Sequence, residues 1–201
     1  MRSTRRALLL ASLGASLLLT PGCAAEPQEG GVPVIEVAGS RAREFRTLDE
    51  LAGQASAVIL AHPTGEQFEV PLPAEQGGTA DSAPTVYVHL VVERVLAGQL
   101  DAEEIDLVSP GIDQRNGRWS LLEGGPYVVF VTPAMYAVGE PTGGYVAVGG
   151  PAGVFASAGD GRVFLRVDGG SPRLPEKIDL GTTQIPAPTA SEAELIRRGH
   201  R

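Results

Sequence analysis

The chain has 201 residues, a formal net charge of −8 and one cysteine, Cys23. This length fits one ordinary domain with tails. A single cysteine excludes an intramolecular disulfide, and the negative charge opposes binding to nucleic-acid phosphates, so we expect no nucleic-acid partner.

The N-terminus has the pattern of an export signal. Arg2, Arg5 and Arg6 precede an uncharged apolar stretch over 7–19. A helix of that length spans about 20 Å, which is too short for a bilayer core of about 30 Å but typical of a signal peptide. We therefore predict a signal peptide over 1–22. The Arg5-Arg6 pair also resembles a twin-arginine signal, so the Sec and twin-arginine routes both stay open.

Cys23 lies directly after this stretch, in TPGCAA. The segment resembles the lipobox of bacterial lipoproteins, in which small residues precede a cysteine that is lipidated and becomes the first residue. Gly22 fits that pattern and Thr20-Pro21 departs from it. We expect Cys23 to be the lipid-attachment residue and the protein to be anchored at the outer face of the bacterial membrane. The alternative is secretion after conventional cleavage at Ala24 or Ala25, which would discard Cys23.

Residues 23–31 are rich in Pro, Gly and Glu, which is typical of a flexible tether. Because the signal peptide contains three arginines and no acid, its removal makes the formal charge about −11. That charge opposes adsorption to anionic lipid. We therefore expect membrane contact through the N-terminal acyl chains alone.

The folded part begins with a short strand over 32–37 and an amphipathic helix. Thr47 and Glu50 have the spacing of a capping box. The apolar residues of one helical face follow: Leu48, Leu51, Ala52 and Ala55. The pattern predicts a helix from Thr47 to about Ser56, and then a buried strand in AVILAH.

The strongest strand pattern is TVYVHLVVERVL. Four apolar residues alternate onto one face, namely Val86, Val88, Leu90 and Val92, with Tyr87, His89 and Glu93 on the other. Further strands are predicted in IDLVSPG, PYVVFVTP, GYVAVGGPAGVFAS and RVFLRV. Asn116-Gly117 and Asp160-Gly161 are turn signals.

Two segments lack a clear strand pattern. Residues 63–84 are rich in turn formers and acids, which predicts a long loop with a short edge strand at 68–72. Residues 181–201 are predicted to form a flexible C-terminal tail, in which Ser191 and Glu194 can cap a helical turn.

These elements predict a mainly β domain over 32–180: a small antiparallel OB-like barrel of five or six strands with one preceding helix and flexible tails. A parallel α/β fold is disfavoured because the sequence lacks crossover helices.

The order of these segments resembles that of a family of uncharacterised exported bacterial lipoprotein domains. The resemblance rests on TLDELAGQASAVILA, VYVHLVVERVLAGQL, IDLVSPG, LLEGGPYVVFVTP and YVAVGGPAGVF, and it covers about Thr47 to Val167. Ala97 stands where the family usually has lysine, and 63–84 is an insertion. The resemblance implies an OB-like barrel similar to that of tissue metalloproteinase inhibitors, and no settled activity. In those inhibitors a free N-terminal cysteine amine binds the protease metal; acylation of Cys23 would block that amine.

Few residues suggest chemistry. His89 lies in mid-strand, where it is either a cross-strand polar neighbour or a general base. No HExxH, HxH or Cys/His cluster is present, so we expect no metal site and no cofactor. Asp113 and Glu123 lie near Trp119, either as the carboxylates of a sugar site or beside an aromatic that caps the end of the barrel.

The sequence thus favours a non-enzymatic exported lipoprotein that binds an unidentified protein or small molecule. OB-fold barrels bind on one face and its bordering loops, which makes Tyr87, His89 and Trp119 the candidate partner contacts. The alternative is an exported hydrolase that uses His89 with a loop carboxylate. Protease inhibition is a third hypothesis, by analogy of fold alone.

Overall fold

The structure, a computed structural model, describes residues 33–36, 44–71 and 83–199. The expected signal peptide, the tether and the lipid-attachment residue Cys23 lie outside the described residues. The described chain is mainly β, as the sequence predicts. It contains no helix with the length and apolar character that crossing a membrane requires.

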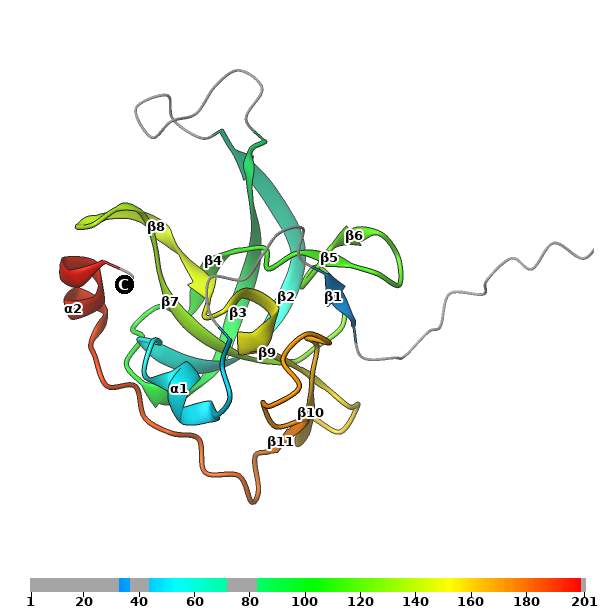
Figure 1. Cartoon of the computed structure of the whole chain (residues 1–201). Coiled ribbons are helices and arrows are strands. Elements are labelled where there is room, and N and C mark those ends of the chain that lie inside the picture. Colours follow the sequence, from blue (N-terminus) through cyan, green and yellow to red (C-terminus); the bar gives the residue numbers. More distant parts are fainter. Residues whose placement is uncertain (1–32, 37–43, 72–82, 200–201) are drawn as a thin grey trace, which may run out of the picture.

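The described elements follow one another along the chain as shown in Figure 1. They are β1 (Ile35–Glu36), α1 (Leu48–Ala52), β2 (Ala57–Val70), β3 (Thr85–Gly98), β4 (Glu104–Val108), β5 (Ile112–Asp113), β6 (Arg118–Trp119), β7 (Tyr127–Ala137), β8 (Glu140–Ala147), the 3₁₀ turn η2 (Gly150–Gly153), β9 (Val154–Ser157), β10 (Val163–Arg166), β11 (Lys177–Asp179) and α2 (Glu192–Arg198).

Most strands belong to one eight-stranded sheet in the order β11-β10-β9-β7-β2-β3-β4-β8. β7 also pairs with β8, so the run of pairings β7-β2-β3-β4-β8 returns to β7. Neighbours in this sheet are antiparallel except β4 and β8, which pair in parallel through Leu107 with Tyr145 and Val108 with Val146. β1, β5 and β6 form a separate three-stranded sheet.

The sheet differs from the expectation of five or six antiparallel strands in two ways. Beyond β7 it continues through β9, β10 and β11, so it has more strands than expected. The parallel β4–β8 pair is possible because the chain between these strands, residues 109–139, is long enough for a crossover. That crossover consists of β5, β6 and β7 rather than a helix.

α1 is positioned by its predicted cap. The Thr47 hydroxyl accepts a hydrogen bond from the Glu50 backbone N–H at 3.1 Å, and the Glu50 carboxylate accepts one from the Arg46 N–H at 2.7 Å. The helix ends at Ala52, earlier than predicted, because the next residues form turn bonds before β2 begins. Its buried face holds Leu48, Leu51 and Ala52.

β2 and β3 form a long antiparallel arm (Figure 1). β2 continues to Val70, so part of the segment predicted as a loop is strand. Register shifts near Pro63 interrupt the pairing, which resumes with Gln67 opposite Val88. Phe68 stacks on Tyr87 with ring centroids 5.2 Å apart, a cross-strand contact within the resumed pairing.

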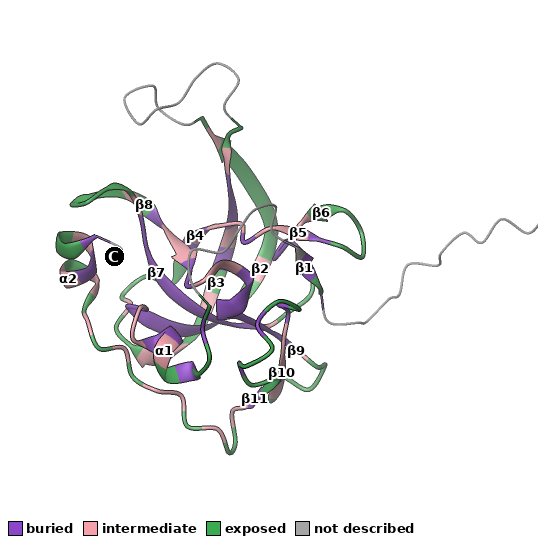
Figure 2. Ribbon diagram, viewed as in Figure 1, coloured by how far each residue is buried: buried purple, intermediate pink, exposed green. Residues whose placement is uncertain are grey.

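Two clusters of buried apolar side chains lie on opposite sides of β2 and β7. The inner cluster lies on the side that β7, β2, β3, β4 and β8 share. It includes Ile59, Val88, Leu90, Leu107 and Val129. The outer cluster lies beneath α1, β10 and β11 and includes Leu51, Leu60, Phe130, Phe155, Phe164 and Ile178. Figure 2 shows that burial is concentrated around β7, β9 and α1 and falls along β2 toward Val70, while the facing part of β3 stays buried.

The predicted turns and the C-terminal cap are present. Gly117 has a φ of +69° between β5 and β6, and Asp160 accepts the Val163 N–H at 2.8 Å between β9 and β10. In the C-terminal segment the Ser191 hydroxyl accepts the Glu194 N–H at 3.3 Å. α2 contacts the β7–β8 hairpin, where the Gly139 N–H donates to the Ile196 carbonyl at 3.0 Å.

Candidate partner-binding face on β2, β3 and β4

One side of the β2–β3–β4 segment carries polar and exposed apolar side chains. Cross-strand partners point to the same side of a sheet, and the register pairs Phe68 with Tyr87 and His89 with Asp106. Val91 is opposite both His62 and Glu104. We call this side the bare face; it consists of His62, Phe68, Tyr87, His89, Val91, Glu93, Glu104 and Asp106.

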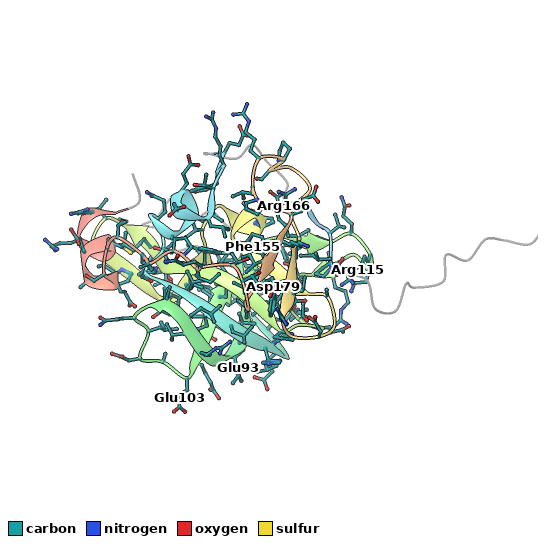
Figure 3. The ribbon with its side chains drawn as sticks, turned by 90° about the horizontal axis from the view of Figure 1, so that it is seen from below. Glu93, Glu103, Arg115, Phe155, Arg166 and Asp179 are labelled. Atoms are coloured by element: carbon teal, nitrogen blue, oxygen red, sulfur yellow. The ribbon has the colours of Figure 1, made fainter. Side chains whose placement is uncertain are left out.

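The predicted alternation of β3 produces this face. Val88 and Leu90 are fully buried in the inner cluster, while Val91 is 39% exposed on the opposite side. Phe68 is 44% exposed despite its stacking contact. In Figure 3, Glu93 and Glu103 point away from the ribbon on the side opposite Arg166.

His89 is held between two carboxylates. Its Nδ1 lies 2.9 Å from Asp106 Oδ1 and its Nε2 lies 3.3 Å from Glu104 Oε2. The His89 side chain is 27% exposed, and both carboxylates are more exposed than that. Asp106 is the direct cross-strand partner of His89. Glu104 lies two residues earlier on β4 and points to the same side of the sheet.

This geometry favours the protonated imidazole. A neutral histidine has one N–H donor, whereas both ring nitrogens here face carboxylate oxygens that can only accept. The hydrogen bond to Asp106 is the largest cause that raises the pKa of His89 above 6.5. Burial is the next largest and lowers this pKa, while the hydrogen bond to Glu104 and the charges of both acids raise it further.

Tyr87 shares the side of His89 but is only 5% exposed. Its hydroxyl donates to Thr142 Oγ1 on β8 at 3.1 Å, and its ring lies against Gly144, where a Cβ atom would come within 2.6 Å of the ring. Tyr87 therefore supports the bare face from beneath Phe68 and offers little surface of its own.

Trp119 lies elsewhere, on β6 of the three-stranded sheet. It is half-buried and packs against the inner cluster. The structure therefore places Tyr87 and His89 on one strand face and Trp119 on a different sheet.

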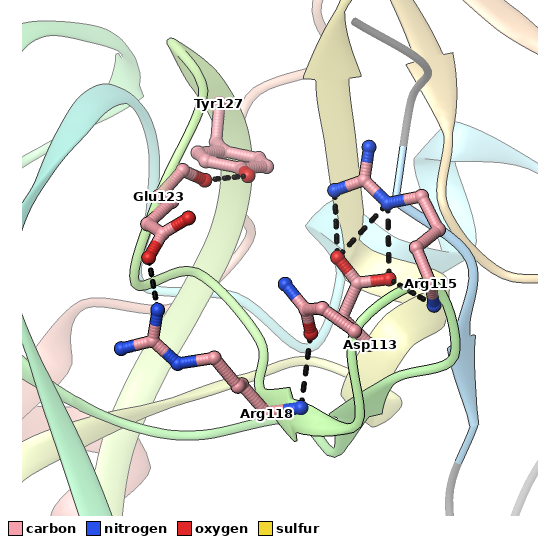
Figure 4. Close-up of polar contacts among 6 residues, drawn as sticks. Asp113, Arg115, Arg118, Glu123 and Tyr127 are labelled. Atoms are coloured by element: carbon pink, nitrogen blue, oxygen red, sulfur yellow. Dashed lines mark hydrogen bonds and ion pairs between the residues drawn. The ribbon is translucent and has the colours of Figure 1, made fainter. Parts of the chain in front are cut away.

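The carboxylates near Trp119 are engaged in ion pairs (Figure 4). Asp113, whose side chain is 6% exposed, forms a bidentate pair with Arg115, with Nη2 2.6 Å from Oδ2 and Nε 3.1 Å from Oδ1. Glu123 pairs with Arg118, and its carbonyl accepts the Tyr127 hydroxyl at 2.7 Å. These contacts fix the β5–β7 connection, so the two carboxylates do not form an open pair beside Trp119.

The chemistry available to His89 is limited by its neighbours. A general base needs a free ring nitrogen near a substrate, but Nε2 already faces Glu104. His89 does not line either of two open cavities. One is bordered by residues 46–49, 173–175, 184 and 186–187, and the other by residues 56, 98–101 and 188–193. Among the described residues, no three His, Cys, Asp or Glu side chains are grouped so that they could hold a metal ion.

Sequence reasoning identified His89 and its face but missed its partners. Asp106 and Glu104 alternate on a strand next to β3, and pairing the two strands across the turn 99–103 would have placed Asp106 opposite His89. Phe68 was missed as a site residue: it lies in the edge strand predicted at 68–72, but that prediction did not say which strand it would pair with. No protein-family model, curated protein or solved structure matches this chain.

Proposed function

We propose that the chain is a non-enzymatic, exported, lipid-anchored protein whose OB-like barrel binds a partner on the bare face. The pairing order supports the barrel. The five strands that would form it are, in chain order, β2, β3, β4, β7 and β8. The first of them, β2, pairs with β3 and β7, and the third, β4, pairs in parallel with the fifth, β8. An OB fold is a five-stranded, partly open barrel that binds ligands on its second and third strands and the adjoining loops. β3 and β4 are those strands here.

The observation that carries the proposal is the exposure of the bare face. The outside of β2 at Val58 and Leu60 and the outside of β7 are covered by α1, β10 and β11. Farther along, Phe68 and Val91 remain about two-fifths exposed between ionisable side chains. Exposed apolar side chains surrounded by polar ones are typical of interaction surfaces. An unidentified protein or small molecule is the partner class that fits, and nucleic acid is disfavoured by charge.

The anchor is proposed from the sequence. Cys23 would receive the acyl chains, and 23–31 would link the membrane to the first described residues. Sec or twin-arginine export, and secretion in place of lipidation, stay open.

The test is site-specific photo-crosslinking in intact cells. A photoreactive phenylalanine analogue replaces Val91 on the bare face or Glu176, an exposed residue beside β11. We expect a discrete crosslinked species from position 91 and none from 176, in the membrane fraction. In a Cys23→Ala variant the protein should leave that fraction and lose the acyl mass.

Two results would count against the proposal. Equal crosslinking from both positions would mean contact without a preferred face, and no crosslink from position 91 would remove the bare face as the binding site. A mature N-terminus at Ala25 or Glu26 without acyl mass would replace anchoring by secretion.

The His89–Asp106 hydrogen bond favours a second candidate, an exported hydrolase with His89 as base. Its carboxylate comes from β4 instead of a loop. This candidate requires Glu104 to move away from Nε2, so Glu104→Gln should raise any hydrolysis of ester or amide substrates while His89→Gln abolishes it.

A further inference from the structure

An open cavity of about 710 Å³ lies on the covered side of the molecule, away from the bare face. It is bordered by the start of α1 (46–49), the loop before β11 (173–175) and the C-terminal segment (184 and 186–187). Its volume falls in the range of small-molecule sites. The start of α1 thus meets two C-terminal segments, distant from it in sequence, around one hollow.

Arg46 and Arg173 both border this cavity. Among the described residues neither guanidinium has a hydrogen bond or an ion pair, although the chain carries more acids than bases. Asp49 also lines the cavity and offsets one of the two charges, which leaves an excess positive charge there. Two arginines without an ion pair to any described residue, placed at one hollow of an acidic protein, suit an anionic ligand.

The backbone that carries each arginine is held in place. The Arg46 N–H donates to the Glu50 carboxylate at 2.7 Å as part of the α1 cap. The loop with Arg173 is held by Arg166, which donates from Nε to the Asp168 carbonyl at 2.8 Å and from Nη1 to the Leu174 carbonyl. In Figure 3 Arg166 lies on the side of the molecule away from Glu93 and Glu103. A site of this kind loses little backbone freedom when a ligand binds.

Other lining groups define the rest of the ligand. Thr47 Oγ1 accepts the Glu50 N–H, so its hydroxyl hydrogen stays available to an acceptor in the cavity. Leu48 and Leu174 belong to the outer cluster and form an apolar wall together with nearby prolines. The cavity therefore combines two cations and a hydroxyl donor with an apolar surface.

We propose that this cavity binds a small organic anion, a carboxylate or phosphate with a compact apolar body. The anionic group lies between Arg46 and Arg173, with the Thr47 hydroxyl as a further donor. The apolar body contacts Leu48 and Leu174. The site is independent of the bare face and does not rest on the function proposed above.

The test is calorimetric and NMR titration of the full chain with four probes. Phenyl phosphate and benzoate are the two anionic arms, inorganic phosphate lacks the apolar body, and benzylamine has the opposite charge. We expect saturable binding of at least one aromatic anion, more tightly than inorganic phosphate, with shifts in the amides of 46–49 and 173–175. Benzylamine should not bind.

Arg46→Gln and Arg173→Gln should each weaken that binding about tenfold or more, because each removes a charge-assisted hydrogen bond. Arg94→Gln on β3 is the matched control, since it removes the same charge from an exposed position outside the cavity. Absence of saturable binding, an equal loss in the Arg94 variant, or benzylamine binding as tightly as the anions would overturn the proposal.

Discussion

The outer surfaces of β7 and of β3 differ in what covers them, although the two strands flank β2. Outside β7, Val128 and Phe130 are fully buried beneath α1, β10 and β11. Outside β3, His89 and Val91 remain partly exposed, with only neighbouring side chains over them. The same sheet is therefore buried on both sides at β7, whereas at β3 it is buried on one side and partly exposed on the other.

The difference is visible in the sequence of each strand. AVILA at the start of β2 and YVVFV in β7 are continuous apolar runs, and both faces of these segments are buried. In β3, TVYVHLVVER alternates: the Val88–Leu90 side is buried, and on the other side Tyr87 is buried while His89 and Val91 remain partly exposed. Continuous runs indicate strands covered on both faces, and alternation indicates a strand with one open face.

The largest expected effect comes from truncating one phenylalanine in each region. Phe164 of β10 is fully buried in the outer cluster, so Phe164→Ala should lower the free energy of unfolding by about 3–5 kcal/mol. Phe68 of the bare face is half-exposed and stacks on Tyr87, so Phe68→Ala should lower it by about 1 kcal/mol. Urea unfolding followed by circular dichroism measures both values.

The comparison requires similar denaturant slopes in the two variants, since a changed slope would indicate a change in the compactness of the unfolded chain. A loss at Phe68 as large as the loss at Phe164 would mean that the bare face is core, and its role as a binding surface would be abandoned.

A smaller loss of stability is expected from a substitution at Gly144 of β8, which lies beside Tyr87 of the bare face. A Cβ atom at Gly144 would lie 2.6 Å from the Tyr87 ring and 2.9 Å from the Asp106 carbonyl. Gly144→Ala should therefore separate β8 from β3 and β4 and lower the free energy of unfolding by about 2 kcal/mol. Urea unfolding measures the loss.

Gly169→Ala is the matched control, because a Cβ atom there meets no heavy atom within 4 Å. We expect that substitution to change stability by less than about 0.5 kcal/mol. Equal effects at the two glycines would show that the close approach of β8 to Tyr87 does not hold this edge of the bare face together.

The sequence predicted elements whose signals are local. The Thr47–Glu50 cap, the Asp160-Gly161 turn and the alternation of β3 each depend on residues a few positions apart, and each is present. The extent of the sheet was missed because Ile178 and Leu174 join the outer cluster from Pro- and Gly-rich segments without a strand pattern. Their burial depends on contacts with α1 and β7, which no local pattern encodes.

The candidate site was predicted in part for the same reason. Alternation placed Tyr87 and His89 on one face, but alternation alone does not reveal which residues lie across from them. The partners of His89 follow from register, which the turn 99–103 sets. The low exposure of Tyr87 results from Phe68 and β8, which are distant in sequence.

The smallest expected effect concerns the charge of His89 on the bare face. Because its pKa is higher in the folded chain than the ordinary 6.5, protonation of His89 stabilises the fold. This contribution is fully present below about pH 6.5 and is lost as the pH rises through the folded pKa. His89→Gln should remove about 0.5 kcal/mol at about pH 5.5 and nothing at high pH, as expected for a partly exposed pair. Unfolding curves at several pH values measure this difference.

NMR titration of the His89 ring separates the two carboxylates. Asp106→Asn should lower the His89 pKa more than Glu104→Gln does, because the shorter hydrogen bond is the largest cause of the shift. A larger change from Glu104→Gln would mean that Nε2 is the more strongly held nitrogen. His89 would then be oriented mainly by Glu104, from the solvent-exposed side of the bare face.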